Sequence, residues 1–152
     1  MTAAGVPGLG TDIVSVARIE RLIGRAGERF TTRWFTPGEI VYCTGKAFPG
    51  RHFAARLAAK EAVVKALGLP PEGPLPWRSV EIVHERGAPC VRLHGTVLAA
   101  ARGADVGELG VSLSHCDEYA VALAWVVGRP APGTSPTSGR TLGPIPAGGD
   151  TP

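Results

Sequence analysis

The chain has 152 residues, of which 44% are hydrophobic and 19% charged, with a formal net charge of +3 and a pI of about 9.0. This length fits one domain that buries roughly two-thirds of the unfolded chain's surface, and the mild basicity favours an acidic or phosphorylated partner without requiring one. The three cysteines, Cys43, Cys90 and Cys116, are odd in number and widely spaced, which argues against a disulfide framework or a zinc knuckle and predicts reduced thiols. Membrane spans and signal peptides need apolar runs that this sequence lacks, so we expect a cytoplasmic protein.

The first elements are a short strand and a helix. We expect the strand around Val6–Leu9, a turn at Gly10–Asp12, and then a helix that Ser15 caps. Helical spacing predicts an apolar face made by Ile19, Leu22, Ile23, Ala26 and Phe30. A second face carries Arg18, Arg21, Arg25 and Arg29. One side of this helix is therefore predicted to join the core, and the other to form a basic ridge.

Two more helices follow. Thr36–Glu39 has a hydroxyl cap, a proline at the first helical position and a glutamate placed to close a capping box, so a short helix should run through Tyr42. The strongest helical signal is the alanine-rich segment from about His52 to Leu67, which Gly68 ends with Pro70 and Pro71 just beyond.

The second half of the chain predicts strands. Ser79–His84 and Pro89–Leu93 should form a hairpin across Glu85–Gly87. Thr96–Arg102 then reads as a helix, and Val111–Ser114 should pair with Tyr119–Val127 around a Cys116–Asp117 turn. Helices with antiparallel strands indicate an α+β domain. Residues 1–127 would form it, and residues 128–152, rich in Pro, Gly, Ser and Thr, should be a disordered tail.

Glu61 interrupts the apolar face that Phe53, Leu57 and Val64 form on the long helix. One explanation is an ion pair with Lys65 one turn later, worth about 0.3–0.5 kcal/mol. The other is a metal ligand, because a hard cation such as Mg²⁺ usually takes one or two protein carboxylates, with phosphates and waters completing its octahedron.

Asp12 is a suitable second ligand for such a cation. It follows Gly8 and Gly10, and the small glycines let a backbone or a phosphate come close. An aspartate before a helix is also a common cap, and a lone Gly-x-Gly is a weak signal. Neither acid is decisive when it is considered singly.

Basic residues gather in the same region of the sequence. Arg56, Lys60 and Lys65 surround Glu61, which suits a metal-bridged pyrophosphate but also describes a solvated helix face. His115 follows a predicted strand, where an imidazole binds phosphate, acts as a base or satisfies a backbone carbonyl.

Taken together and in order, these segments resemble the holo-acyl-carrier-protein synthase type of phosphopantetheinyl transferase. The resemblance rests on Gly8–Ile13 with Arg18-Ile19, on Arg56–Ala62 with Lys65–Gly68, and on Val111–His115. Arg29-Phe30 and the stretch from Phe35 to Glu39 also look like the family's middle region. Leu57, where phenylalanine is common, and Cys116-Asp117 depart from the pattern without removing a charged motif residue.

The resemblance implies an α+β subunit with an antiparallel sheet packed on the long helix. It also implies a homotrimer whose active sites form between neighbouring subunits, since 152 residues are too few for the fused two-lobe relatives. The reaction would transfer the phosphopantetheine arm of coenzyme A to a serine of an apo acyl carrier protein, releasing adenosine 3′,5′-bisphosphate.

Roles for the site residues follow from the same resemblance. Asp12 and Glu61 would hold Mg²⁺, with Glu61 as the candidate base and Lys65 nearby to stabilise or protonate a phosphoryl oxygen. The residues that would bind the phosphates of coenzyme A are Arg56, Lys60, Ser114 and His115. The residues that would dock the acidic helix of the carrier are Arg18, Arg21 and Arg25.

Two rival functions explain some of these features. One is a non-catalytic module whose basic ridge binds nucleic acid or another phosphorylated ligand, although sparse aromatics and modest basicity count against a nucleic-acid partner. The other is a different Mg²⁺-dependent enzyme acting on nucleotides. Both leave the ordered set of motifs unexplained.

Overall fold

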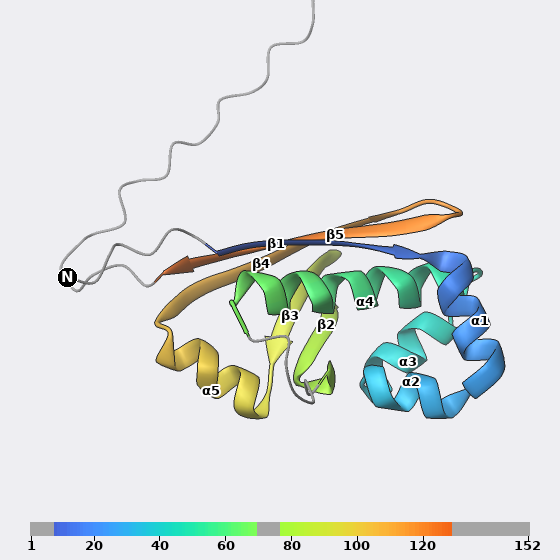
Figure 1. The fold of residues 1–152 in the computed structure, drawn as a ribbon, viewed down its shortest axis with the longest axis horizontal. Helices are drawn as coiled ribbons and strands as arrows, with labels where there is room; N and C mark the ends of the chain where they lie inside the picture. The colour runs from blue at the N-terminus through green and yellow to red at the C-terminus, as the bar shows by residue number, and fades with distance from the viewer. Residues whose placement is uncertain (1–7, 70–76, 129–152) are drawn as a thin grey trace, which may run out of the picture.

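The computed structural model describes residues 8–69 and 77–128. Helix α4 (Pro49–Ala66) lies along one face of a three-stranded antiparallel sheet of order β1-β5-β4 (Figure 1). The elements of that sheet are β1 (Gly8–Ser15), β4 (Val106–His115) and β5 (Tyr119–Gly128). A two-stranded hairpin of β2 (Val80–Glu85) and β3 (Ala88–Leu93) packs against both α4 and β4, and the short 3-10 helix η1 (Trp77–Ser79) precedes it. The predicted α+β class is confirmed.

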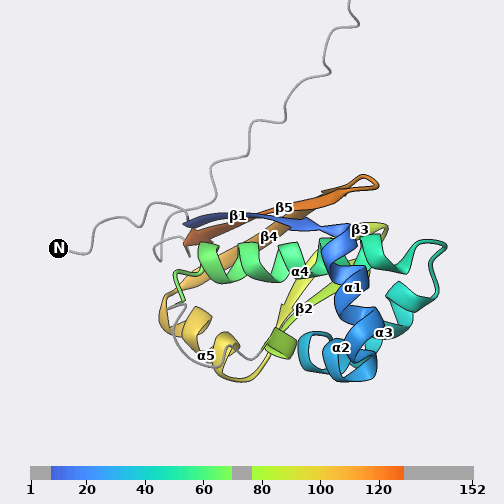
Figure 2. The same ribbon diagram turned by 45° about the vertical axis from the view of Figure 1, so that its right-hand side comes forward.

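The remaining helices cover the two ends of α4. Helices α1 (Val16–Ala26), α2 (Glu28–Trp34) and α3 (Pro37–Thr44) gather at one end, and α5 (Gly95–Gly103) lies at the other (Figure 2). Within the described ranges, no helix has the length and apolar character that crossing a membrane requires.

The predicted turn at Gly10–Asp12 is wrong, because β1 continues through it to Ser15. Every residue of β1 pairs with β5, from Gly8 opposite Val126 to Ser15 opposite Tyr119. The glycines have a packing role instead, since a Cβ at Gly10 would strike the carbonyl oxygen of Ala62. They let the backbone of α4 lie directly against β1.

The first helical region is two helices rather than one. Ser15 caps α1 as predicted, accepting a hydrogen bond from the backbone N–H of Arg18 at 3.3 Å. The helix then ends at Ala26, because Gly27 takes a positive φ of 53°. Phe30 therefore lies on α2 and not on the predicted continuation of α1, although it still reaches the core.

The capping box that begins α3 is confirmed. Thr36 Oγ1 accepts from the backbone N–H of Glu39, and the Glu39 carboxylate accepts from the backbone N–H of Thr36 at 2.8 Å. Helix α4 starts at Pro49, three residues before the predicted His52, and Gly68 follows its end at a φ of 63°.

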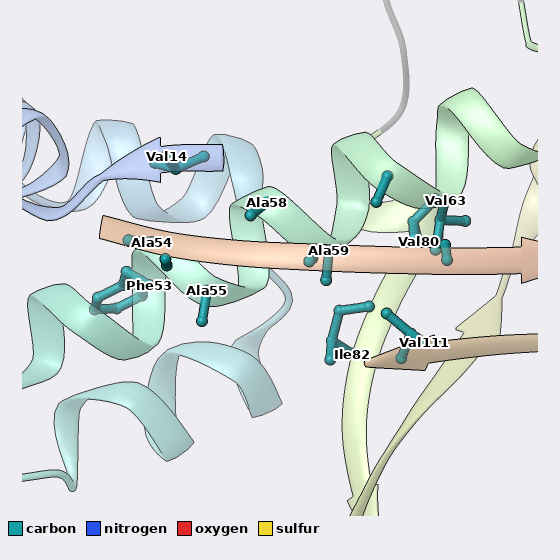
Figure 3. Close-up of a cluster of buried hydrophobic side chains, with 14 of the residues drawn as sticks. Val14, Phe53, Ala54, Ala55, Ala58, Ala59, Val63, Val80, Ile82 and Val111 are labelled. Carbon is teal, nitrogen blue, oxygen red and sulfur yellow. The ribbon is translucent and has the colours of Figure 1, made fainter. Parts of the chain in front are cut away.

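The core forms where small side chains let the layers approach. Buried alanines line α4, and Val63, Val80 and Ile82 fill the space between α4 and the hairpin, whereas Phe53 packs against Phe35 at 4.9 Å between ring centroids (Figure 3). Alternate residues of β5 face this core: Ala120, Ala122, Ala124 and Val126. Alanine on both elements explains the close contact of α4 with the sheet.

The predicted hairpin and final strands are confirmed, with β4 longer than expected because it begins at Val106. The predicted helix at Thr96–Arg102 is also present, as α5. The strand expected at Val6–Leu9 begins partly outside the described residues. The expected tail lies outside them from residue 129 onward, so its disorder stays a prediction.

Candidate functional site

Asp12 and Lys65 meet where β1 crosses α4. The Lys65 ammonium donates to Asp12 Oδ1 at 2.8 Å and to the Thr11 carbonyl oxygen at 2.9 Å. Asp12 lies on the helix-facing side of β1, opposite the buried Ala122 of β5. Among the ion pairs of the described residues, Lys65 is joined to Asp12, so the alternative of a Glu61–Lys65 pair does not describe this structure.

Glu61 lies one helical turn before Lys65 and is half-buried. Burial raises the pKa of the Glu61 carboxyl, and the nearby Asp12 carboxylate raises it further, while Lys65 and Arg18 oppose the shift. The two carboxylates are thus close enough to repel each other. A group of this kind has the elevated basicity that proton transfer needs.

The donor set fits a magnesium ion. Mg²⁺ usually takes one or two protein carboxylates and leaves its other positions to phosphate and water. Asp12 and Glu61 provide two carboxylates on rigid elements, a strand and a helix, and a cation between them would relieve their mutual repulsion.

Arg56 belongs to a basic cluster that lies on another face of α4. Its guanidinium carbon lies 3.9 Å from the centroid of the Tyr42 ring, and Nη2 lies 3.3 Å from His84 Nδ1. Tyr42 also stacks on the His84 ring at 4.8 Å between centroids, and the Lys46 ammonium lies 4.3 Å from the Tyr42 centroid. The Arg56 Nε is buried and is left without a hydrogen-bond partner in the described structure.

His115 extends this cluster from the end of β4. Its ring lies 5.1 Å from that of His52, and His52 in turn makes an edge contact with Tyr42 at 6.0 Å. Burial lowers the pKa of His52, and His115, Arg56 and Lys46 lower it further. Burial also lowers the pKa of His84, with Arg56 and Lys46 adding to the shift. This concentration of cationic groups would attract an anion.

Four members of this basic cluster were not predicted: Tyr42, Lys46, His52 and His84. They come from α3, the α3–α4 connection, α4 and β2, so no sequence spacing joins them. Helical periodicity places Tyr42 on α3 but does not indicate what it faces.

Lys60 is placed differently from expectation, and the contacts of its side chain give no support to the predicted role in binding phosphate. Its side chain is 0% exposed, and the ammonium donates to Glu39 Oε2 at 2.8 Å, to the Trp77 carbonyl at 3.0 Å and to the Val80 carbonyl. Those three acceptors use all three donors of the ammonium. Lys60 therefore joins α4 to α3 and the start of β2, inside the protein.

Ser114 and the arginines of α1 lie at the edges of the site. Ser114 pairs with Val121 on the sheet face turned away from α4, whereas His115 shares the face of the buried Ala120. Arg18, Arg21 and Arg25 are exposed on α1. Arg18 is near enough to Glu61 to lower the pKa of that carboxyl.

Comparisons with known proteins agree with this arrangement. Residues 8–124 match the model of the 4′-phosphopantetheinyl transferase superfamily. A holo-[acyl-carrier-protein] synthase of Moorella thermoacetica is 48% identical over 118 residues, which cover 77% of this chain and 91% of the relative.

Solved structures of the same kind are also similar. The holo-[acyl-carrier-protein] synthase of Neisseria meningitidis has a TM-score of 0.72 at 31% identity, covering 78% of this chain and 96% of that one. The Helicobacter pylori enzyme in complex with coenzyme A has a TM-score of 0.68 at 32% identity, covering 78% and 98%.

Proposed function

The chain belongs to the 4′-phosphopantetheinyl transferase superfamily, and we propose that it transfers the phosphopantetheine arm of coenzyme A to a serine of an apo acyl carrier protein. It is a holo-[acyl-carrier-protein] synthase. The observation that carries the proposal is the junction of β1 and α4, where Asp12, Glu61 and Lys65 converge. Residues 1–127 form the catalytic domain in this proposal.

Asp12 and Glu61 would hold Mg²⁺. When bound, the ion neutralises charge on the pyrophosphate of coenzyme A and on the oxygens that gain charge during transfer. The phosphates of coenzyme A would be bound by the groups around Tyr42, with Arg56 and His115 as the predicted members. Arg56 and Glu61 lie five residues apart on α4, roughly 7 Å along the helix axis and about 140° around it, so the two side chains leave different faces of the helix.

Glu61 acts as the base in this proposal. The serine oxygen of the carrier forms a bond to the phosphorus that bears the pantetheine arm, and the bond from that phosphorus to adenosine 3′,5′-bisphosphate breaks. The serine proton passes to the Glu61 carboxylate, whose pKa is raised by burial and by Asp12. Lys65 stabilises the charge on the departing phosphoryl oxygen by donating a hydrogen bond.

The basic ridge of α1 would receive the carrier. Arg18, Arg21 and Arg25 are exposed, and an acidic helix beside the modified serine would be steered toward them by opposite charge. Arg18 also acts electrostatically on Glu61, so a carrier docked here would present its serine close to the candidate base.

We also propose that the protein is a homotrimer, as the resemblance implies. The sheet face turned away from α4 carries large exposed apolar side chains, which favours burial against further copies of the chain. They are Leu9, Ile13, Tyr119, Val121, Leu123 and Val127. Ser114 lies on this same face, so its predicted contact with coenzyme A would belong to a site shared with a neighbouring subunit.

A cytoplasmic location fits the reduced thiols and the coenzyme A substrate.

The test is to incubate the protein with an apo acyl carrier protein, coenzyme A and Mg²⁺, and to measure the intact mass of the carrier. We expect a gain of one phosphopantetheine that disappears with EDTA and with Asp12→Ala. Hydrolysis of a nucleotide without any carrier would support the rival Mg²⁺-dependent enzyme. Nucleic-acid binding with no mass gain on several carriers would support the rival binding module.

A further inference from the structure

The buried ion pair of Lys60 and Glu39 is the feature of the molecule that the proposed chemistry does not use. Both side chains are 0% exposed, and they lie 2.8 Å apart. A fully buried ion pair gains little net stability over well-packed apolar side chains, because desolvation offsets the attraction. Its presence therefore needs another explanation, and conformational specificity is one that buried polar groups provide in some proteins.

The pair ties four elements together. The Lys60 ammonium of α4 donates to Glu39 on α3 and to two carbonyl oxygens at η1 and the start of β2. The Glu39 carboxylate also accepts from the backbone N–H of Ile82 at 3.0 Å, on β2. The pair and its backbone partners thus fix α4 to α3 and the hairpin by directional bonds, which apolar packing lacks.

Lys60 and Glu61 are consecutive residues of α4, so they leave the helix about 100° apart around its axis. One faces α3 and β2, and the other faces the Asp12 side of the site. The buried core around them is made of small and β-branched side chains such as Ala59 and Val63 (Figure 3). Side chains of this kind make no directional bonds, so the hydrogen bonds of the ion pair add orientation that apolar packing alone does not supply.

We propose that the Lys60–Glu39 pair is a positioning device that sets the rotation of α4 and thereby the place of Glu61 and Lys65 relative to Asp12. The inference rests on the proposed function for the role of those three residues. A rotation of about 10° moves a side-chain end that lies roughly 5 Å from the helix axis by about 1 Å. A displacement of that size at a reacting group costs on the order of 10²-fold in rate.

The test compares E39Q/K60M with V63A. The double variant removes both charges and so avoids leaving one of them buried and unpaired. Val63 is a fully buried residue of the same helix without a polar side chain, and its truncation supplies a matched loss of stability. The single variant E39Q keeps a hydrogen-bonding group beside Lys60 but leaves the Lys60 charge without its counter-ion, so it is compared at a temperature where it is folded. Folding of each variant is checked by circular dichroism.

We expect E39Q/K60M to lose at least tenfold in kcat, with the KM for coenzyme A within about twofold of wild type. The Mg²⁺ concentration for half-maximal activity should rise several-fold. V63A should keep the wild-type kcat and Mg²⁺ dependence at a temperature where it is folded. A folded E39Q/K60M, or E39Q in its place, with the wild-type kcat and the wild-type Mg²⁺ dependence would overturn the proposal. A pair that only stabilises the fold would change neither of these two quantities.

Mn²⁺ binding, followed by electron paramagnetic resonance, separates this inference from the proposed function. It needs no carrier and no turnover. If the wild-type protein loads no carrier, the proposed function fails, yet weaker Mn²⁺ binding by E39Q/K60M than by V63A would still support the positioning role. Equal Mn²⁺ binding by the two variants would reject it.

Discussion

The Lys65 ammonium lies 2.8 Å from the Asp12 carboxylate, although 53 residues separate them in the chain. The contact exists because Gly8 and Gly10 place no side chain of their own between β1 and α4. The carbonyl oxygens of Ala66 and Ala62 occupy the positions that a Cβ on these glycines would need. The site is therefore built by the close approach of two backbones as much as by charged residues.

Gly10→Ala should consequently damage both stability and the site. The new methyl group meets the backbone of α4, which cannot move away as a flexible side chain would, so we expect a loss of about 1–3 kcal/mol in unfolding free energy. It should also separate Asp12 from Lys65 and lower kcat in the protein that remains folded.

Gly24→Ala is the matched control for that change. Gly24 lies on α1 with open space where its Cβ would be, so alanine there should stabilise the helix by about 0.5–1 kcal/mol. Urea denaturation and carrier loading measure both effects. A Gly10→Ala protein as stable and active as wild type would contradict the packing role of the glycine.

The raised pKa of Glu61 predicts opposite pH dependences for activity and stability. Activity should increase as pH rises through the pKa that Glu61 has with Mg²⁺ bound, because only the carboxylate accepts the serine proton; the cation lowers this pKa relative to the metal-free protein. Stability should fall over the window from the ordinary glutamate pKa of 4.5 up to the raised value, because ionisation is disfavoured in the folded state.

Glu61→Gln tests both parts of this prediction. The variant should lose carrier loading while remaining folded, and its unfolding free energy in EDTA should lack the fall with pH that Glu61 causes. Urea denaturation at several pH values, beside wild-type protein, measures that difference. Near-normal turnover by Glu61→Gln would refute the assignment of the base.

The histidines around Tyr42 should link coenzyme A binding to proton uptake. The pKa values of His52 and His84 are lowered, so both are largely neutral at pH 7 in the free protein, and a bound phosphate would favour their charged forms. The affinity for coenzyme A should therefore rise as pH falls toward and below 6.5.

His84→Phe keeps an aromatic ring against Tyr42 but removes one titrating group and the partner of Arg56. We expect a KM for coenzyme A that is several-fold higher at pH 6, with a smaller difference at pH 8. Calorimetry in two buffers of different ionisation enthalpy counts the protons taken up on binding. The same count for wild type and His84→Phe would mean that this histidine does not sense the phosphate.

Local signals in the sequence predicted most of the elements. Ser15, the Thr36–Glu39 capping box and the alanine-rich α4 act through neighbours in the chain, and each is found where it was expected. The proximity of Asp12 to Glu61 was expected only from the family resemblance, because the turn predicted at Gly10–Asp12 did not indicate what Asp12 faces.

What the sequence did not reveal depends on partners that folding brings together. Lys60 looks like a surface residue until α3 and β2 cover it, and the continuity of β1 through Gly10 depends on β5. The basic cluster joins four parts of the chain around Tyr42. Propensity and periodicity describe single segments, so they do not predict such convergence.

The ridge on α1 gives a prediction that concerns the carrier alone. Replacing Arg18 and Arg21 by glutamate turns attraction into repulsion for an acidic partner, so the KM for the carrier should rise by at least tenfold, with added salt reducing the difference. Arg102→Glu is a suitable control with a smaller charge change, because Arg102 is an exposed arginine on α5 at the opposite end of α4.

Arg18 also lowers the pKa of Glu61, so the single Arg21→Glu variant separates an effect on docking from an effect on the base. An unchanged carrier KM in the double variant would remove α1 from the docking surface.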